Sequence, residues 1–114
     1  MQVDVDLGTN ALRLEHEGPI AWCTIDRPTA RNALTPAMHY GIKRAVRHVN
    51  KSPDLSALII TGTGDVFSSG GDLGGRSEPG ESVPEEVGYD ILPFLAVRDS
   101  RAPVIAVHWK RLRG

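Results

Sequence analysis

The residues of this chain with the clearest capacity for chemistry are glycines that follow a short apolar run at residues 55–61. Within residues 62–75 they stand at positions 62, 64, 70, 71, 74 and 75. Backbone without side chains can approach a ligand closely, and its N–H groups can converge on one point. Convergent N–H groups suit phosphate binding or stabilisation of an oxyanion. A plain flexible loop is the alternative, which composition alone leaves open.

Three known glycine motifs do not fit this stretch. A P-loop needs Gly-Lys-Ser/Thr, which does not follow. The dinucleotide fingerprint needs a third glycine where Phe67 stands. A hydrolase nucleophile elbow needs glycine two residues before its serine, but Val66 precedes Ser68 and Phe67 precedes Ser69. These three kinds of site are therefore excluded.

The sequence before the glycines predicts two strands and a helix. Residues 11–15 and 20–25 are expected to be strands, joined by a turn at Glu17-Gly18-Pro19. Thr35 suits a helix N-cap, Pro36 suits the first helical position, and Ser52-Pro53 ends the helix. The expected buried face of this helix carries Met38, Ile42, Val46 and Val49, and the residues largely off it are Lys43, Arg44, Arg47 and His48.

Further elements are expected on both sides of a polar loop at residues 76–82. Residues 55–61 and 103–107 are apolar, β-branched runs typical of buried strands. Ser82 and Glu85 suggest a capping box for a helix with Val87, Ile91 and Leu95 on one face. The order β-β-α-β-(α)-β predicts an α/β domain with crossover helices.

Composition narrows the partners and the compartment. The chain has 114 residues, 40% hydrophobic and 24% charged, with a net charge of −1, which favours a globular domain and argues against nucleic-acid or membrane binding. Residues 1–10 lack the pattern of a signal peptide. The single cysteine, Cys23, is expected to be a small buried hydrophobe, and the default location is cytoplasmic.

Three segments, in order, resemble one family. TGTGDVFSSGGDL, from Thr61, resembles a crotonase-superfamily turn that follows a strand. RPTARNALTPAM, from Arg27, resembles the family's Arg-Pro-x-x-x-Asn-Ala-Leu segment, and RAPVIAVH, from Arg101, resembles its following strand. The chain is therefore similar to the amino-terminal part of an enoyl-CoA hydratase/isomerase, over roughly residues 12–108.

This resemblance implies a fold, a ligand and a set of positions. The fold would be a truncated, crotonase-like α/β ββα-spiral at residues 11–108, with a polar extension at 1–10 and a basic, non-family tail at 109–114. The ligand would be an acyl-CoA thioester, coenzyme A being part of the substrate, with no separate cofactor and no metal. The backbone N–H of Gly71 would donate to the thioester oxygen, where two fixed donors stabilise an enolate-like oxyanion. Other implied positions are Ser69, Gly70, Asp72 and Leu73 at the pantetheine and acyl end, and Arg27, Ala30 and Arg31 at the adenosine and phosphate end.

Several residues have plainer interpretations. Asn32 is expected to be a loop or cap residue rather than a catalytic one. For Arg27 and Arg31, a phosphate contact and simple solvation stay open. His39 and His48 are expected on the surface, at a spacing that does not suit a shared metal, and Trp22 in the core. The glutamates expected to form a surface acidic run are Glu78, Glu81, Glu85 and Glu86.

The resemblance ends after His108. There the family continues with a second glycine turn, which supplies the second oxyanion donor, and later with two catalytic glutamates. This chain instead ends in WKRLRG, and family members are well over twice as long. Loss of one oxyanion donor costs about 10²–10³ in rate, and loss of an acid or base about 10²–10⁴. We therefore expect no activity from the chain alone, and a frameshift or truncation is the hypothesis for its tail.

Three functions follow from these observations. The first is a truncated enoyl-CoA hydratase, a lyase of fatty-acid oxidation. The second is a non-catalytic acyl-CoA-binding or partner fragment, which would form a homo-oligomer or associate with a full-length relative. The third is another crotonase reaction, because the shared oxyanion loop does not select the chemistry. An uncovered strand at residues 103–107 favours aggregation or dependence on a partner.

Overall fold

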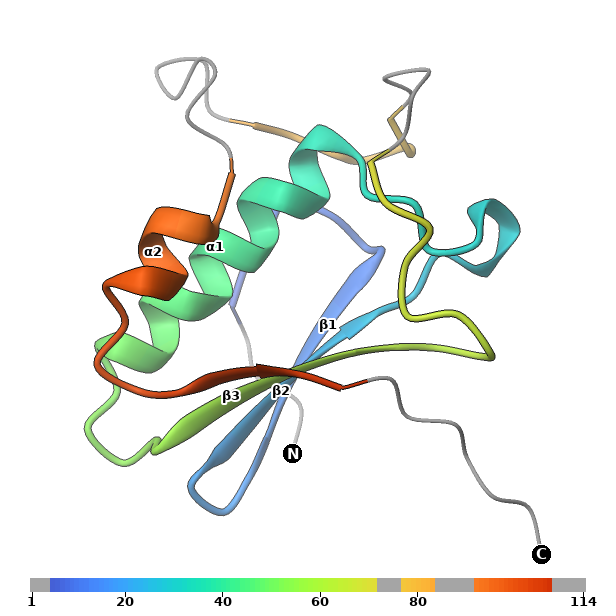
Figure 1. Cartoon of the computed structure of the whole chain (residues 1–114). Coiled ribbons are helices and arrows are strands. Elements are labelled where there is room, and N and C mark those ends of the chain that lie inside the picture. The colour runs from blue at the N-terminus through green and yellow to red at the C-terminus, as the bar shows by residue number, and fades with distance from the viewer. Residues whose placement is uncertain (1–4, 72–76, 84–91, 108–114) are drawn as a thin grey trace, which may run out of the picture.

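The described part of the chain folds as one sheet covered on one face by helices (Figure 1). The computed structural model describes residues 5–71, 77–83 and 92–107. Within these residues the sheet has the order β1-β2-β3-β4, with β1 antiparallel to β2 and the other pairs parallel. The elements are β1 (Leu12–Glu17), β2 (Ile20–Ile25), η1 (Pro28–Ala30), α1 (Pro36–Asn50), β3 (Ala57–Gly62), α2 (Phe94–Arg98) and β4 (Val104–Ala106).

The first two strands form the expected hairpin. Gly18 has a φ of +57°, which glycine adopts without steric cost, and Glu17 pairs directly with Ile20 across the turn. Because side chains alternate along a strand, one set of residues on β1 and β2 faces α1. This set is buried and consists of Leu12, Leu14, Ala21, Cys23 and Ile25.

The helix α1 forms where the sequence predicts it. The Thr35 hydroxyl accepts a hydrogen bond from the Met38 N–H at 3.2 Å, and Pro36 occupies the first helical position. The expected apolar face is confirmed, since Met38, Ile42, Val46 and Val49 are all buried. Lys43 is buried too, against expectation, because a lysine stem can lie along apolar surface while its ammonium reaches polar groups.

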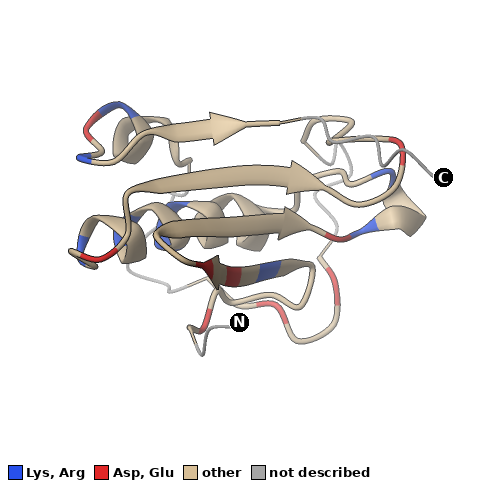
Figure 2. Ribbon diagram, turned by 90° about the horizontal axis from the view of Figure 1, so that it is seen from below, with Lys and Arg blue, Asp and Glu red and all other residues tan. Residues whose placement is uncertain are grey.

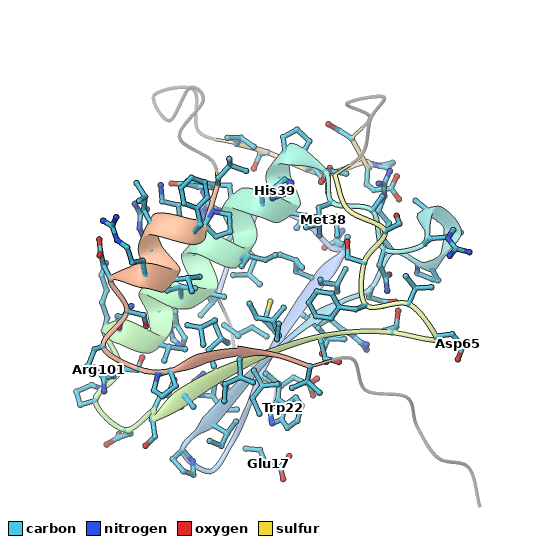
Figure 3. All side chains as sticks on the ribbon, in the orientation of Figure 1. Glu17, Trp22, Met38, His39, Asp65 and Arg101 are labelled. Carbon is cyan, nitrogen blue, oxygen red and sulfur yellow. The ribbon has the colours of Figure 1, made fainter. Side chains whose placement is uncertain are left out.

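Two interpretations of apolar residues change. Trp22 is half-buried rather than core, because the alternation that turns Ala21 and Cys23 toward α1 turns Trp22 to the opposite face (Figure 3). The capping-box residue Glu85 and the predicted helical positions Val87 and Ile91 lie outside the described residues. Leu95 is in α2, but it is 46% exposed rather than buried. Cys23 is fully buried as expected, and burial raises the pKa of its thiol to about 12.

The two edges of the sheet differ in charge. Figure 2 shows both signs of charge on β1, which carries Arg13, Glu15 and Glu17. Charges on an edge strand discourage pairing with another chain. At the other edge β4 reads Val-Ile-Ala, and Ile105 is 47% exposed. The apolar edge expected from residues 103–107 is therefore present.

A pair of histidines joins β1 to α1. The Nε2 atoms of His16 and His48 are 3.1 Å apart, and the rings are stacked with centroids 5.1 Å apart. A hydrogen bond between them needs one nitrogen with a proton and one without. Burial and the nearby His48 lower the pKa of His16 from its usual 6.5. His48 is therefore not a purely solvated surface residue.

This pair predicts a stability that depends on pH. Because the folded state lowers the pKa of His16, the unfolded chain binds a proton more readily below pH 6.5. The free energy of unfolding is expected to rise with pH as it approaches 6.5, and to fall as pH drops below that value. Urea unfolding of wild type and His16→Gln between pH 5 and 8 tests this. The variant should show a shallower slope, with a remainder from His39, whose pKa burial also lowers. Identical slopes would contradict the prediction.

Candidate functional site

The candidate site is formed by two loops that follow the neighbouring parallel strands β2 and β3, at the carboxyl ends of these strands. The first loop, residues 26–35, follows β2, and the second loop, residues 63–71, follows β3. Figure 1 shows them side by side. The Ser69 N–H donates to the Arg31 carbonyl at 3.1 Å, and the Leu34 N–H donates to the Gly70 carbonyl at 2.8 Å. The two segments that the sequence analysis assigned to one ligand are thus in direct contact.

The Asn32 side chain joins the two loops through hydrogen bonds. It has a φ of +58°, a left-handed conformation that asparagine tolerates better than most residues, and it is only 1% exposed. Its side-chain oxygen accepts from the Arg27 N–H at 2.8 Å. Its amide donates to the carbonyls of Thr63 at 3.0 Å and Val66 at 2.7 Å. Asn32 is a structural loop residue, as expected.

Ser68 and Gly70 shape the backbone that precedes Gly71. The Ser68 hydroxyl donates to the Asn32 carbonyl at 2.8 Å and accepts from the Gly70 N–H at 3.1 Å. Gly70 has a φ of +104°, which a residue with a side chain would adopt only with strain. Among the residues that the structure describes, no protein acceptor takes the Gly71 N–H. Gly71 is exposed, so this donor can meet a ligand.

The positions that the resemblance implies for the ligand differ in their exposure. Ser69, Gly70 and Gly71 lie exposed on the second loop, and Ala30 lies half-buried in η1. Arg31 is exposed, with a φ of +53°. Asp72 and Leu73 are outside the described residues.

Arg27 differs from Arg31 in its surroundings. It is only 6% exposed, and its Nη1 donates to the Ala33 carbonyl at 3.1 Å. Its Nη2 lies 3.5 Å from the carboxylate of Glu78. The guanidinium therefore holds the first loop together and neutralises an acid, whereas Arg31 presents its charge to solvent.

Glu81 is more than part of a surface acidic run. It is half-buried, and its Oε2 accepts from the hydroxyls of Thr9 at 2.6 Å and Thr35 at 2.9 Å. Its Oε1 accepts from the Glu78 N–H at 2.8 Å. A carboxylate beside a helix N-terminus is electrostatically favourable. Glu81 thus anchors the start of α1, and no local pattern could reveal partners 46 and 72 residues away.

His39 also lies in a different environment from the one that the sequence predicts. It is half-buried rather than on the surface, and burial lowers the pKa of its imidazole. Its Nε2 lies 4.0 Å from the position that a Cβ would occupy on Gly71. Figure 3 labels His39 and Met38 near the start of α1. Helical periodicity separates His39 from the buried Met38 but does not reveal that a glycine loop lies beside it.

Two other kinds of feature are absent from the described ranges. There, no group of three or more His, Cys, Asp or Glu residues is arranged to hold a metal ion. No helix within them has the length and apolarity that crossing a membrane requires.

Comparisons with known proteins give a consistent result. The family model described as enoyl-CoA hydratase/isomerase matches residues 15–108. The crystal structure of a probable enoyl-CoA hydratase/isomerase from Mycobacterium abscessus is 38% identical with a TM-score of 0.65, covering 86% of this chain and 37% of that one. The probable enoyl-CoA hydratase EchA14 of Mycobacterium tuberculosis is 33% identical over 91 residues, which are 76% of this chain and 34% of the relative.

A third relative carries a different name. The carnitinyl-CoA dehydratase of Salmonella arizonae is 37% identical over 100 residues, which are 86% of this chain and 38% of the relative. The chain therefore spans about a third of the length of the curated relatives that it matches.

Proposed function

Because the chain belongs to the enoyl-CoA hydratase/isomerase family, we propose that its two loops bind the coenzyme A thioester of an acyl group. The expected crotonase-like α/β fold is confirmed by structural matches at 33% and 38% identity, each covering 37% of the matched chain. The observation that carries the proposal is the open Gly71 N–H at the end of a loop held by Asn32 and Ser68.

The chemistry of this site follows from the fixed donor. In the proposal the Gly71 N–H donates to the thioester oxygen and polarises the carbonyl. A donor held in place by the surrounding loops needs no reorganisation when negative charge develops on that oxygen. Ser69 and Gly70, together with Asp72 and Leu73, line the pantetheine and acyl end. Coenzyme A is part of the substrate, and the proposal includes no further cofactor.

The proposed reaction of the complete protein is addition of water to the double bond of a 2-enoyl-CoA. Two relatives whose names include enoyl-CoA hydratase support this reaction. They are EchA14 and EchA19 of Mycobacterium tuberculosis, at 33% and 38% identity. Binding without turnover is the second candidate, favoured because the proposed site uses a single donor, the Gly71 N–H, whereas two fixed donors stabilise the oxyanion in the family. Titration with crotonyl-CoA while hydration is monitored separates the two.

Location and association are further parts of this proposal. A cytoplasmic location suits a chain whose single cysteine is a buried free thiol. Association with a second copy or a full-length relative suits the apolar surface at the β4 edge and on α2, where Phe94 is 61% exposed.

Arg31 provides the test of coenzyme A binding. It is the arginine of the first loop that is exposed, and in the proposal it contacts a phosphate of coenzyme A. Loss of a hydrogen bond to a charged group costs about 1.5–3 kcal/mol, so Arg31→Ala is expected to weaken binding of both coenzyme A and acetyl-CoA about tenfold or more. Isothermal titration calorimetry of the folded variants measures this.

Arg47→Ala is the matched control. Arg47 is an exposed arginine on the last turn of α1, far along the helix from the first loop. Its removal changes the net charge equally but should leave both dissociation constants within about twofold, as expected for a distant surface charge. The proposal fails if the folded wild type binds neither ligand, or if both arginine variants bind alike.

A further inference from the structure

We propose that His39 is a substrate-contacting residue, whose Nε2–H donates a hydrogen bond to the thioester end of an acyl-CoA held at Gly71. This inference rests on the proposed function, since it assumes that acyl-CoA binds in the two loops. It goes further by naming a side chain that separates a thioester from free coenzyme A.

The first step is the position of the imidazole. The Nε2 atom lies 4.0 Å from the place of a Cβ on Gly71, and among the residues that the structure describes no other atom outside the chain neighbours of Gly71 lies within that distance. Covalent geometry puts a Cβ about 2.5 Å from its own backbone nitrogen, so Nε2 is within about 6.5 Å of the Gly71 nitrogen. One ligand group of a few atoms can therefore meet both donors at ordinary hydrogen-bond lengths of about 2.9 Å.

The second step is the protonation of the imidazole. His39 is half-buried, and this burial lowers the pKa of its ring, so the ring is neutral at pH 7.5. A neutral imidazole carries one proton and can donate one hydrogen bond. A thioester offers only acceptors, so the contact requires the tautomer with the proton on Nε2.

The third step is the rigidity of the position. The His39 N–H donates to the Thr35 carbonyl at 3.1 Å within the first turn of α1. The Thr35 side chain caps this turn and donates to Glu81 at 2.9 Å. On the facing side, the Leu34 N–H donates to the Gly70 carbonyl at 2.8 Å. The backbone of His39 and the backbone that precedes Gly71 are thus each held by hydrogen bonds, which reduces the ordering cost of binding.

The experiment compares two ligands on the whole chain. Isothermal titration calorimetry at pH 7.5 gives dissociation constants for acetyl-CoA and coenzyme A in wild type and three variants. His39→Leu removes the donor, His39→Gln keeps an N–H donor, and His48→Leu removes a half-buried histidine elsewhere on α1. Circular dichroism establishes that each variant is folded.

The expected result is a selective loss. A neutral hydrogen bond contributes about 1 kcal/mol, so His39→Leu should weaken acetyl-CoA binding about fivefold and leave coenzyme A binding unchanged. His39→Gln should restore much of the loss, and His48→Leu should match wild type. In ¹⁵N spectra, the wild-type His39 Nε2 signal should shift with acetyl-CoA and not with coenzyme A.

Four results would overturn the inference. Equal weakening of both ligands, or no change, in His39→Leu rejects the role of His39 and leaves coenzyme A binding in place. A wild type that binds both ligands equally does the same. If a folded wild type binds neither ligand, the proposed function fails together with the inference.

Discussion

Replacing Asn32 with alanine is expected to lower the free energy of unfolding by about 3–4 kcal/mol, because it removes three hydrogen bonds of a buried side chain at once. The Arg27 N–H and the Thr63 and Val66 carbonyls would each lose their side-chain partner. Alanine would also have to keep a φ of +58°, a left-handed conformation that costs about 1 kcal/mol more than for asparagine. Urea unfolding followed by circular dichroism measures the change.

Two further substitutions separate these causes. Asn32→Gly also lacks the side chain but tolerates the positive φ, so it should be about 1 kcal/mol more stable than Asn32→Ala. Asn32→Asp keeps the acceptor for the Arg27 N–H but turns a charged oxygen toward two carbonyls. It should be at least as unstable as Asn32→Ala at pH 7, and it should recover when acid protonates the new carboxyl group.

The same substitution should affect binding in a distinct way. Asn32 touches no ligand in the proposed site, but it joins the loop that carries Arg31 to the loop that ends at Gly71. If the Asn32→Ala variant remains folded, its binding of acetyl-CoA and of coenzyme A should weaken to the same extent. This differs from the selective loss of acetyl-CoA binding expected for His39→Leu. A variant as stable as wild type would show that water replaces the lost partners, and the structural role of Asn32 would be rejected.

The sequence predicts this fold well where the pattern is local. The hairpin of β1 and β2 depends on a short turn at Gly18, and α1 depends on an N-cap at Thr35 and a periodic face, so neighbouring residues are sufficient. Burial is less predictable. Alternation assigns Trp22 to the face opposite Cys23, but the sequence does not say which face a helix covers. A tryptophan within an apolar strand is therefore predicted to be core, although it can lie on either face of the sheet.

Contacts between distant residues explain the other differences. Glu81 lies among charged residues in the sequence, yet it meets Thr9 and Thr35 because the described segment at 77–83 returns to the start of α1. His39 lies beside Gly71 because the second loop crosses the same helix end. Family resemblance supplied the candidate ligand and the position of Gly71, but it supplied neither of these contacts.

Gly62 is the position where a single added carbon is expected to disturb both the fold and the site. Gly62 ends β3, and the second loop folds back over it. A Cβ there would overlap the Phe67 carbonyl oxygen and come within 2.8 Å of the Val66 oxygen. Both obstacles are backbone atoms, which cannot rotate away as a side chain can, and the Val66 carbonyl also accepts from Asn32. We expect Gly62→Ala to lower the free energy of unfolding by about 3 kcal/mol.

Gly64→Ala is the matched control, two residues along the same loop. Gly64 has a φ of +71°, but a Cβ there meets no atom of the described residues within 4 Å. Its cost is therefore the conformational strain alone, about 1 kcal/mol. Denaturant unfolding should place Gly62→Ala about 2 kcal/mol below Gly64→Ala, and in amide spectra Gly62→Ala alone should shift residues 66–71. Equal stabilities would mean that the second loop moves freely over Gly62, and Gly71 could not then be a preorganised donor.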